Sequence, residues 1–399
     1  MTIAVLGAGA REHALATRLR AERGDDAVVV TPGGVCVPGS VAAPPRDPEL
    51  VIVGPEALLA DGVADRLRAS GIAVVGPGRE EARLESSKAW SKAFMERHGV
   101  ATARSRICVG VTHIREAAHA ELARGEGVVL KYDGLAAGKG VFVCDDADAV
   151  EQAMHALHDA HGAESTILVE ERLRGRELSL LALVAGGQAR LFPPVEDHKQ
   201  LEDGDRGPLT GGMGVSYPIP HDGLALRATL QQAIVEPTLR GLRAELPDYR
   251  GVLFFGVMLT DEGPKLLEYN VRFGDPEAQV LTTAMAESLS ALCMQVANGT
   301  PPAPGWVQMA ADACVCVVLA APGYPRGPLT VTPVCVAPHP GISLYHAATR
   351  MEGERLVSAG GRVLSVVATG ASLQDARSRV YAALRETPLH YRRDIGARR

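Results

Sequence analysis

The chain has 399 residues, a formal net charge of −6, 46 % hydrophobic residues and 22 % charged residues. This is ordinary globular composition, and a chain of this length can bury the cores of two or three domains without disulfides. The acidic balance argues against a nucleic-acid partner, and no apolar run is long enough to span a bilayer. The seven cysteines are scattered without a zinc-binding spacing, which is typical of a reducing compartment. We therefore expect a cytoplasmic protein that binds neither nucleic acid nor membranes.

Strands and helices alternate in the first part of the chain. The expected strands lie at 2–6, 27–30, 50–53 and 72–75, and the expected helices at 11–20 and 58–70. This alternation predicts a parallel sheet that binds ligands at the carboxyl ends of its strands.

The remaining elements are expected in the following order. A helix is predicted over 79–98, then short strands and helices over 106–185, a Gly-, Asp- and Pro-rich loop over 186–215, and strands at 251–259 and 265–270. A Pro-rich linker at 301–305 precedes several strands and a helix near 373–385. We therefore expect an α/β protein with three domains, over 1–98, 99–305 and 306–399.

The turn after the first strand resembles the start of a dinucleotide-binding motif. Glu12 stands where the third glycine is needed, and Thr31 stands where the second strand of a dehydrogenase ends in an acidic residue. A dehydrogenase is therefore poorly supported. The helix N-terminus after Gly9 can still bind a phosphate, with Arg11 adding charge, although a plain strand–helix turn is the alternative.

Lysine is scarce in this chain. Lys and Arg together number 41, and only six of them are Lys. Since the two residues are not interchangeable at a phosphate, the few lysines are candidates for chemistry. Lys131 ends a strand, and Lys139 follows in a loop that contains Gly134, Gly138 and Gly140. This pattern, which is not a Walker A loop, favours a nucleotide held under a lid over a simple hairpin turn.

Acidic residues follow the strand that begins near Ile167. Glu170 and Glu171 lie at its end, where free backbone groups can meet an adenine edge, and Glu177 can accept from ribose hydroxyls. By itself this signal is weak, and a solvated acidic patch is the alternative.

A second strand end carries the strongest metal signal. Glu268 and Asn270 alternate on a strand and so project to one face. Two oxygen ligands together with ATP phosphates suit Mg²⁺. Arg272 continues the same face and can neutralise a phosphate or an acyl phosphate.

Taken together, these motifs resemble the ATP-grasp carboxylate–amine ligases, and more narrowly the phosphoribosylamine–glycine ligase (glycinamide ribonucleotide synthetase) family. The matching segments are 7–14 (GAGAREHA), 53–56 (VGPE), 84–95 (LESSKAWSKAFM), 133–140 (DGLAAGKG), 197–199 (DHK), 207–214 (GPLTGGMG), 268–277 (EYNVRFGDPE), 360–364 (GGRVL) and 393–398 (RDIGAR). They span nearly the whole chain.

The resemblance implies an ATP-grasp architecture. Its parts are an N-terminal parallel-sheet (pre-ATP-grasp) domain that binds the acceptor, a central ATP-grasp domain with a mobile lid over about 112–185, and a C-terminal mixed-sheet domain. It also implies that ATP phosphorylates a carboxylate and that an amine then attacks the acyl phosphate. The expected cofactors are ATP and Mg²⁺ or Mn²⁺, the expected partners are small molecules (an amino acid or other carboxylate and an amine acceptor), and the expected assembly is a monomer or homodimer.

The resemblance also assigns roles to residues. The catalytic residues would be Arg272, Lys139 and Asp275. The nucleotide would contact Lys92, Lys131, Gly134, Gly138, Lys139, Gly140, Val169, Glu170, Glu171, Leu173 and Glu177. The other substrates would contact Gly9, Ala10, Arg11, Glu12, Glu56, Asp197, Lys199, Gly212, Gly274 and Asp275. Glu268 and Asn270 would hold the metal, and His13 and His198 would bind rather than act as bases.

Several loops expected near the acceptor depart from the family's usual sequence. Residues 33–37 lack the usual Asn, Leu209 replaces another Asn, Ala348 replaces a Gly, Val195-Glu196 replaces Ser-Gln, and the segment before the strand at 50–53 is short. Three functions therefore stay open. The chain joins glycine to 5-phosphoribosylamine, or it joins another carboxylate and amine in a specialised pathway, or it binds a nucleotide without ligase activity.

Overall fold

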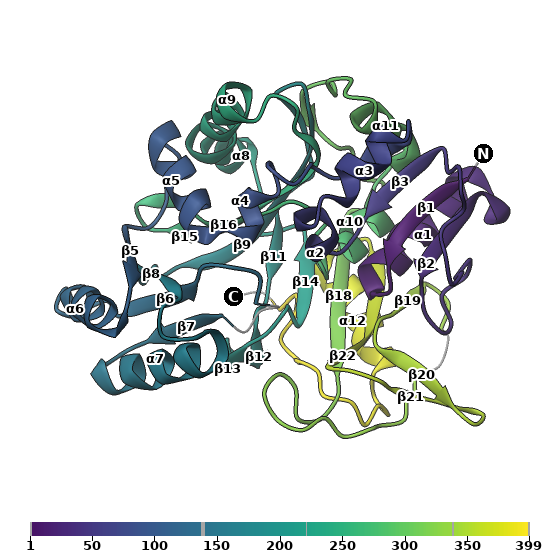
Figure 1. Ribbon diagram of the computed structural model, residues 1–399. Coiled ribbons are helices and arrows are strands. Elements are labelled where there is room, and N and C mark those ends of the chain that lie inside the picture. Colours follow the sequence, from purple (N-terminus) through teal and green to yellow (C-terminus); the bar gives the residue numbers. More distant parts are fainter. Residues whose placement is uncertain (1, 137–139, 221, 337–338, 398–399) are drawn as a thin grey trace.

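The computed structural model describes residues 2–136, 140–220, 222–336 and 339–397. Three sheets organise these residues (Figure 1). A parallel four-stranded sheet forms the N-terminal part, an antiparallel four-stranded sheet forms a separate lobe, and a ten-stranded sheet runs between them.

The N-terminal sheet has the strand order β2-β1-β3-β4. Its elements are β1 (Ile3–Gly7), α1 (Ala10–Arg23), a 3₁₀ turn (Asp25–Ala27), β2 (Val28–Pro32), β3 (Leu50–Val53), α2 (Glu56–Ala60), α3 (Val63–Ala69) and β4 (Ala73–Val75). The predicted parallel sheet is thus confirmed. The single helix expected over 58–70 is instead two helices, because Gly62 adopts a left-handed conformation (φ +77°) between them.

The short segment between β2 and β3 closes the outer edge of β2. Val30 N–H donates to the Gly39 carbonyl over 2.9 Å, and Val41 N–H donates to the Val30 carbonyl over 2.9 Å. The Ser40 hydroxyl bonds both Gly34 N and the Val37 carbonyl. A few residues therefore cover an edge that would otherwise expose unpaired backbone groups.

The antiparallel lobe, which we call the lid, has its own core. It consists of β5 (Ser105–Val109), α6 (Val111–Leu122), β6 (Val128–Tyr132), β7 (Val141–Cys144), α7 (Ala147–His161) and β8 (Thr166–Glu171), in the strand order β5-β8-β6-β7. Side chains of α6 and α7, including Ile114 and Leu157, pack on Leu130 and Val169 of the sheet. In Figure 1 the lid stands apart at the left, which agrees with this separate core.

Two helices lead into the lid where a single helix was expected over 79–98. They are α4 (Arg83–Ser86) and α5 (Lys88–His98). Ser87 is extended, and its hydroxyl accepts from Trp90 N–H, so it ends one helix and caps the next.

The large sheet has the main strand order β16-β15-β9-β11-β14-β18-β22-β19. Its strands are β9 (Arg176–Ala185), β10 (Gln188–Leu191), β11 (Val195–Asp197), β14 (Gly214–Tyr217), β15 (Arg250–Thr260), β16 (Gly263–Asn270), β17 (Gly305–Trp306), β18 (Ala313–Ala320), β19 (Ile342–His346) and β22 (Arg362–Gly370). Two hairpins project from it, β12 (Gln200–Glu202) with β13 (Arg206–Leu209) and β20 (Thr349–Glu352) with β21 (Arg355–Ser358). Its helices are α8 (Leu224–Leu230), α9 (Glu236–Glu245), α10 (Glu277–Ala284), α11 (Leu289–Ala297) and α12 (Leu373–Ala383), with a π turn at Gln231–Val235.

Three expectations about this region need correction. The loop expected over 186–215 is wrong, since the segment forms β10 to β13 and begins β14. Long neighbours such as β9 and β18 supply backbone partners that outweigh a turn-rich composition. The expected lid range includes β9, which belongs to the large sheet. The large sheet also continues across residues 305 and 306, where a domain boundary is expected.

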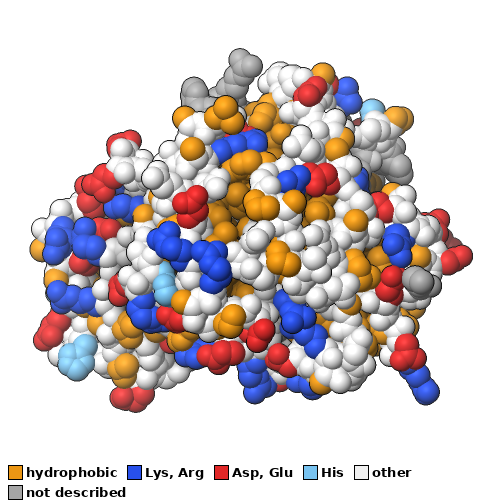
Figure 2. Space-filling model, turned by 90° about the horizontal axis from the view of Figure 1, so that it is seen from above, with side chains coloured by type: hydrophobic (Ala, Val, Ile, Leu, Met, Phe, Trp, Pro, Cys, Tyr) orange, Lys and Arg blue, Asp and Glu red, His pale blue; other side chains and the backbone are white. Residues whose placement is uncertain are grey.

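The surface agrees with a chain of near-balanced charge. On the face in Figure 2, Lys and Arg side chains are interspersed with Asp and Glu side chains. Within the described ranges, every helix is too short or too polar to cross a bilayer.

A buried arginine connects the C-terminal segment to the hairpin β12–β13 through hydrogen bonds. Arg392 is fully buried and donates to Asp205 over 2.8 Å, to Asp394 over 2.6 Å and to the Gln200 carbonyl over 3.1 Å. Its guanidinium therefore holds the C-terminal segment against the hairpin that precedes residues 210–213.

We predict that Arg392→Met lowers the free energy of unfolding by about 3 kcal/mol, because it leaves carboxylates without their buried partner. Urea denaturation of the purified protein measures this loss. The control is Arg393→Met at the exposed neighbouring position, which should change the value by less than about 0.5 kcal/mol. Equal losses in both variants would contradict the prediction.

Candidate functional site

The lid sheet presents a face that its helices do not cover. The strand registers pair Ile107 with Leu168 and Leu168 with Lys131, and residues opposite one another on antiparallel strands share a face. The intervening residues, such as Leu130, lie in the core under α6 and α7. Ile107 is 52 % exposed. This face therefore combines open apolar surface with a lysine, a combination that suits a flat base with attached phosphates.

A buried ion cluster joins this face to the large sheet. Glu170 accepts from Lys92 over 2.8 Å and from Lys131 over 2.7 Å, and all three side chains are at least nine-tenths buried. Lys131 also donates to the Leu267 carbonyl over 3.1 Å, which connects the lid to β16. Burial disfavours the charged carboxylate, but the two ammonium groups outweigh it and hold the pKa of Glu170 below its usual range. One negative and two positive charges leave a net positive site that suits an anion.

The other residues assigned to the nucleotide take varied positions. Val169 points into the lid core. Only its backbone can therefore face the region between the lid and β16 around Lys131 and Glu268, which we call the cleft. Glu171 accepts from Arg104 N–H and lies 3.8 Å from Lys265. The Gly134 carbonyl accepts from Lys88. Leu173 follows β8, and the Gly140 carbonyl accepts from Tyr132 N–H. Gly138 and Lys139 lie outside the described residues.

Glu268 and Asn270 lie on β16 as the alternation predicts. Glu268 Oε1 is 3.6 Å from Lys199 Nζ, and the same ammonium lies 3.6 Å from Glu177. Burial opposes ionisation of Glu268, but Lys199 and Lys131 together with other cations lower its pKa to about 2. An ionised carboxylate next to an amide oxygen fits a hard divalent cation. Among the described residues no group of three His, Cys, Asp or Glu side chains could hold a metal, so a cation here would need further oxygens, such as phosphates.

Arg272 lies between the cleft and the N-terminal part. It donates to Asn270 Oδ1 over 2.9 Å and forms ion pairs with Glu85 at 3.0 Å and Glu56 at 3.5 Å. Burial disfavours the charged guanidinium, but Glu85 and Glu56 raise its pKa above the usual value. Glu85 was not predicted from the sequence, where its position within the family-like segment 84–95 was the available signal.

A cavity of about 530 Å³ has Asp275 in its wall. It is lined by Ala8, Gly9, Ala10, Gly33, Gly34, Asp275, Val318, Ala347, Ala348, Thr349, Ala359, Gly361, Arg362, Leu364 and Ser365. These residues bring the turn before α1, the loop after β2 and the C-terminal strands to one place. Four of the fifteen have polar or charged side chains, so backbone groups make up much of its polar surface.

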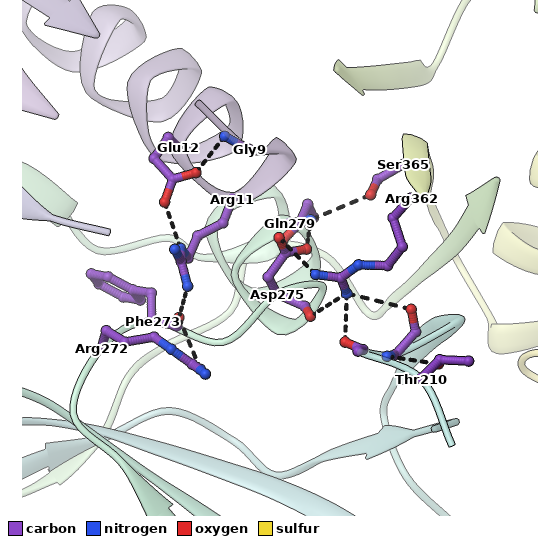
Figure 3. Close-up of polar contacts among 12 residues, drawn as sticks. Gly9, Arg11, Glu12, Thr210, Arg272, Phe273, Asp275, Gln279, Arg362 and Ser365 are labelled. Atoms are coloured by element: carbon purple, nitrogen blue, oxygen red, sulfur yellow. Dashed lines mark hydrogen bonds and ion pairs between the residues drawn. The ribbon is translucent and has the colours of Figure 1, made fainter. Parts of the chain in front are cut away.

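Arg362 fixes the floor of this cavity, and it too was missed. It forms an ion pair with Asp275 at 3.1 Å and donates to the Asp275 carbonyl over 2.7 Å and to the carbonyls of Gly211 and Gly212 (Figure 3). Gln279 donates to the other Asp275 oxygen over 2.8 Å. The carboxylate of Asp275 is therefore held in place from two sides. Arg362 lies in the family-like segment 360–364, but no local pattern there indicates its partners.

Two residues assigned to the substrate turn away from the cavity. Glu12 is buried and accepts from Gly9 N–H over 2.7 Å, so it caps α1 (Figure 3). A Cβ on Gly54 would lie 1.9 Å from Glu12 Oε1, which shows how tightly this carboxylate is packed. Arg11 pairs with Glu12 and donates to the Phe273 carbonyl over 3.1 Å. Both side chains brace the turn whose backbone lines the cavity.

The remaining substrate candidates lie around Asp197. Its carboxylate is buried 4.0 Å from Lys199 Nζ, and burial together with Glu277 raises its pKa well above the usual value. A Cβ on Gly212 would lie 3.4 Å from Asp197 Oδ1, and a Cβ on Gly274 would clash with Glu277. Both glycines therefore permit close approach of carboxylates at the junction of cavity and cleft.

The departures from the family's usual sequence divide into two groups. Among the substituted positions, Gly34 and Ala348 line the cavity. Leu209 does not, since it pairs with Gln200 in the hairpin β12–β13. Leu209, although its loop is expected near the acceptor, therefore lies outside the lining of this cavity.

His13 lies directly behind the cavity wall. Its Nδ1 accepts from His346 N–H over 2.9 Å, and its side chain is buried. Burial, with a smaller effect of His346, lowers the pKa of His13 from 6.5 to about 4. The imidazole is therefore neutral at neutral pH.

Comparisons with known proteins agree with these features. Profiles of the Phosphoribosylglycinamide synthetase N domain, ATP-grasp (A) domain and C domain match residues 1–85, 86–278 and 314–398. The chain belongs to this family. Phosphoribosylamine–glycine ligase of Leifsonia xyli subsp. xyli is 40 % identical, with all of both chains covered. The ADP-forming ATP-grasp C–N ligase predicted from the motifs is thereby confirmed.

Solved structures support the same assignment. The crystal structure of phosphoribosylamine–glycine ligase from Thermotoga maritima is 31 % identical, with a TM-score of 0.83 over 99 % of this chain and 100 % of that chain. The biotin carboxylase domain of Hydrogenobacter thermophilus 2-oxoglutarate carboxylase, solved with MgADP and bicarbonate, has a TM-score of 0.73 at 15 % identity. It covers 98 % of this chain and 91 % of its own, and this likeness shows the fold alone.

The lowered pKa of His13 predicts a pH-dependent stability. Between pH 6.5 and pH 4 the unfolded chain binds a proton at this residue that the folded chain does not, so stability falls as the pH is lowered. The loss reaches about 2 kcal/mol at pH 5. Urea denaturation at several pH values between 7 and 5 measures the free energy of unfolding. This free energy should fall less steeply with decreasing pH in His13→Asn than in the parent chain. An identical pH dependence in both would contradict the assignment.

Proposed function

We propose that this chain joins glycine to 5-phosphoribosylamine, with ATP converted to ADP and phosphate. The observation that carries the proposal is that one short segment serves both the cleft and the cavity. Glu268 and Asn270 face the cleft, Arg272 lies between the two, and Asp275 lines the cavity. A phosphoryl donor in the cleft and an amine in the cavity would therefore meet beside Arg272.

The chemistry that we propose is activation of a carboxylate followed by attack of an amine. A carboxylate is a poor electrophile, so its oxygen first takes the terminal phosphoryl group of ATP. The amine then attacks the acyl carbon, the C–N bond forms, and phosphate leaves. Catalysis of this kind depends on positioning and charge neutralisation rather than on a covalent nucleophile. Arg272 is placed to steady the acyl phosphate, and Asp275 to orient the amine.

We propose ATP and Mg²⁺ as the cofactors. The cleft supports this through the cluster of Lys92, Lys131 and Glu170 and the apolar face of the lid. Glu268 and Asn270 would hold the metal, which supplies charge neutralisation at the phosphates when bound. Val169 to Leu173 would meet adenine through their backbone. Glu177 would bind the ribose, and Lys139 and the glycines around it would cover the phosphates.

The three-part division of the chain is also kept as a proposal, with the lid shortened to the sheet from β5 to β8. The separate core of the lid supports movement as a unit. The small-molecule partners follow from the reaction, and we propose that the chain needs no macromolecular partner for it.

A second candidate is a ligase that uses a different amine. Gly34 and Ala348 line the cavity at positions where the family usually has Asn and Gly. A lost amide removes hydrogen bonds to a polar acceptor, each worth about 1 kcal/mol. The lining of this cavity therefore supports a change of the amine acceptor, with the nucleotide unchanged.

We predict that Glu268→Gln raises the Mg²⁺ concentration needed for half-maximal ADP formation by about tenfold or more, because a neutral amide is a weaker ligand for a hard cation. Titration of Mg²⁺ at fixed ATP measures the effect. The matched control is Glu262→Gln on the same hairpin, where the side chain is 78 % exposed. An unchanged Mg²⁺ requirement in Glu268→Gln would refute the metal assignment.

The acceptor assignment is tested by genetic complementation. We expect this chain to restore growth without purine in a strain that lacks its own glycine-ligating purine enzyme. Growth of that strain would also show that the substitutions at Gly34 and Ala348 do not abolish binding of 5-phosphoribosylamine. No growth, combined with ADP release that depends on another amine, would replace the proposal by the second candidate.

A further inference from the structure

The wall of the cavity opposite α1 comes from a distant part of the chain. Ala347 and Ala348 connect β19 to β20, which begins at Thr349, and all three residues line the cavity. Backbone bonds from Ala347 and Ala348 to the carbonyls of Val363 and Arg362 hold this connection to β22. These bonds lie within the C-terminal part, so they do not fix the connection relative to the N-terminal turn that forms the opposite wall.

His13 makes the link between the two walls. It lies on α1, one turn after Gly9 and Ala10, which line the cavity themselves. Its Nδ1 accepts from the backbone N–H of His346, the last residue of β19, over 2.9 Å. The two imidazole rings are stacked with centroids 5.8 Å apart, and Tyr345 meets the His13 ring edge-on at 5.6 Å. The ring of His13 is therefore held by contacts as well as by its hydrogen bond.

The link continues to a side chain that lines the cavity. His346 Nδ1 lies 3.4 Å from Thr349 Oγ1, and Thr349 is one of the few polar lining residues. Burial lowers the pKa of His346 as well as that of His13. With His346 neutral and Nδ1 as the acceptor, the Thr349 hydroxyl donates to the ring, and its lone pairs stay available to the cavity.

We propose that His13 is a positioning residue for the acceptor. It holds His346, which in turn orients the Thr349 hydroxyl toward the amine-bearing substrate in the cavity. This inference rests on the proposed function, because it takes the cavity as the acceptor site. It assigns His13 no proton transfer, and it requires only that Nδ1 accepts a hydrogen bond.

Three variants at one position separate this role from simple packing. In His13→Asn the amide oxygen can take the place of Nδ1 as the acceptor. In His13→Gln the amide extends one bond further, and in His13→Leu no acceptor remains. Steady-state kinetics with each substrate varied in turn should give His13→Leu and His13→Gln a KM for 5-phosphoribosylamine raised about tenfold, the size expected from one lost hydrogen bond. The KM values for ATP and glycine should stay within about twofold of the parent values.

His13→Asn should restore the KM for the amine to within about threefold of the parent value. Thr349→Val should raise it as His13→Leu does, and the double variant should be no worse than either single one. Parent-like KM values in His13→Leu, equal rises for all three substrates, or failure of Asn to restore the KM would each overturn the inference.

Hydrogen exchange distinguishes a failure of this inference from a failure of the proposed function. The His346 amide should exchange faster in His13→Leu than in the parent chain and at the parent rate in His13→Asn. If the parent chain turns over no 5-phosphoribosylamine, the proposed function fails, and the inference falls with it as a statement about that acceptor. If the parent chain is active and exchange at His346 is the same in all variants, the inference alone fails.

Discussion

Arg272 is the point at which the parts of this molecule meet. Its guanidinium contacts Glu85 of α4, Glu56 of α2 and Asn270 of β16. Removing one partner of a buried ion pair leaves an uncompensated charge in a medium of low dielectric constant. The N-terminal part, the large sheet and the residues that face the nucleotide cleft are therefore held in one arrangement. The same guanidinium is the cation that we propose to steady the acyl phosphate, so stability and proposed chemistry depend on one group.

The other buried charges are likewise paired with groups of opposite charge or with hydrogen-bond donors. Glu170 is tolerated inside the protein because Lys92 and Lys131 lie within 2.8 Å of it. Asp275 is held by Arg362 and Gln279. All five described lysines contact carbonyls or carboxylates around the cleft. In a chain that uses arginine almost everywhere else, this agrees with the idea that a compact ammonium group is kept where it serves the site.

The cavity has a different character from the cleft. Few of its lining side chains are charged, and Gly9, Gly34 and Gly361 contribute no side chain to its wall. Its walls come from residues more than 300 positions apart in the chain, joined at His13 and His346. Small changes in the loop after β2 or in residues 347–349 would therefore alter this cavity, the proposed acceptor site, and the chain departs from its family at Gly34 and Ala348 in these two segments.

The sequence by itself determined the parallel N-terminal sheet, the ATP-grasp family, and the shared face of Glu268 and Asn270. These follow from local periodicity and from short motifs, whose spacing in the sequence does not depend on tertiary contacts. It did not determine that 186–215 forms strands, because backbone partners on β9 and β18 decide this and lie outside the segment. Nor did it identify Glu85 and Arg362 as partners of Arg272 and Asp275, or place Glu12 inside its turn. Those contacts are between side chains, most of them distant in sequence, and only the packing of the folded chain brings them within hydrogen-bonding distance.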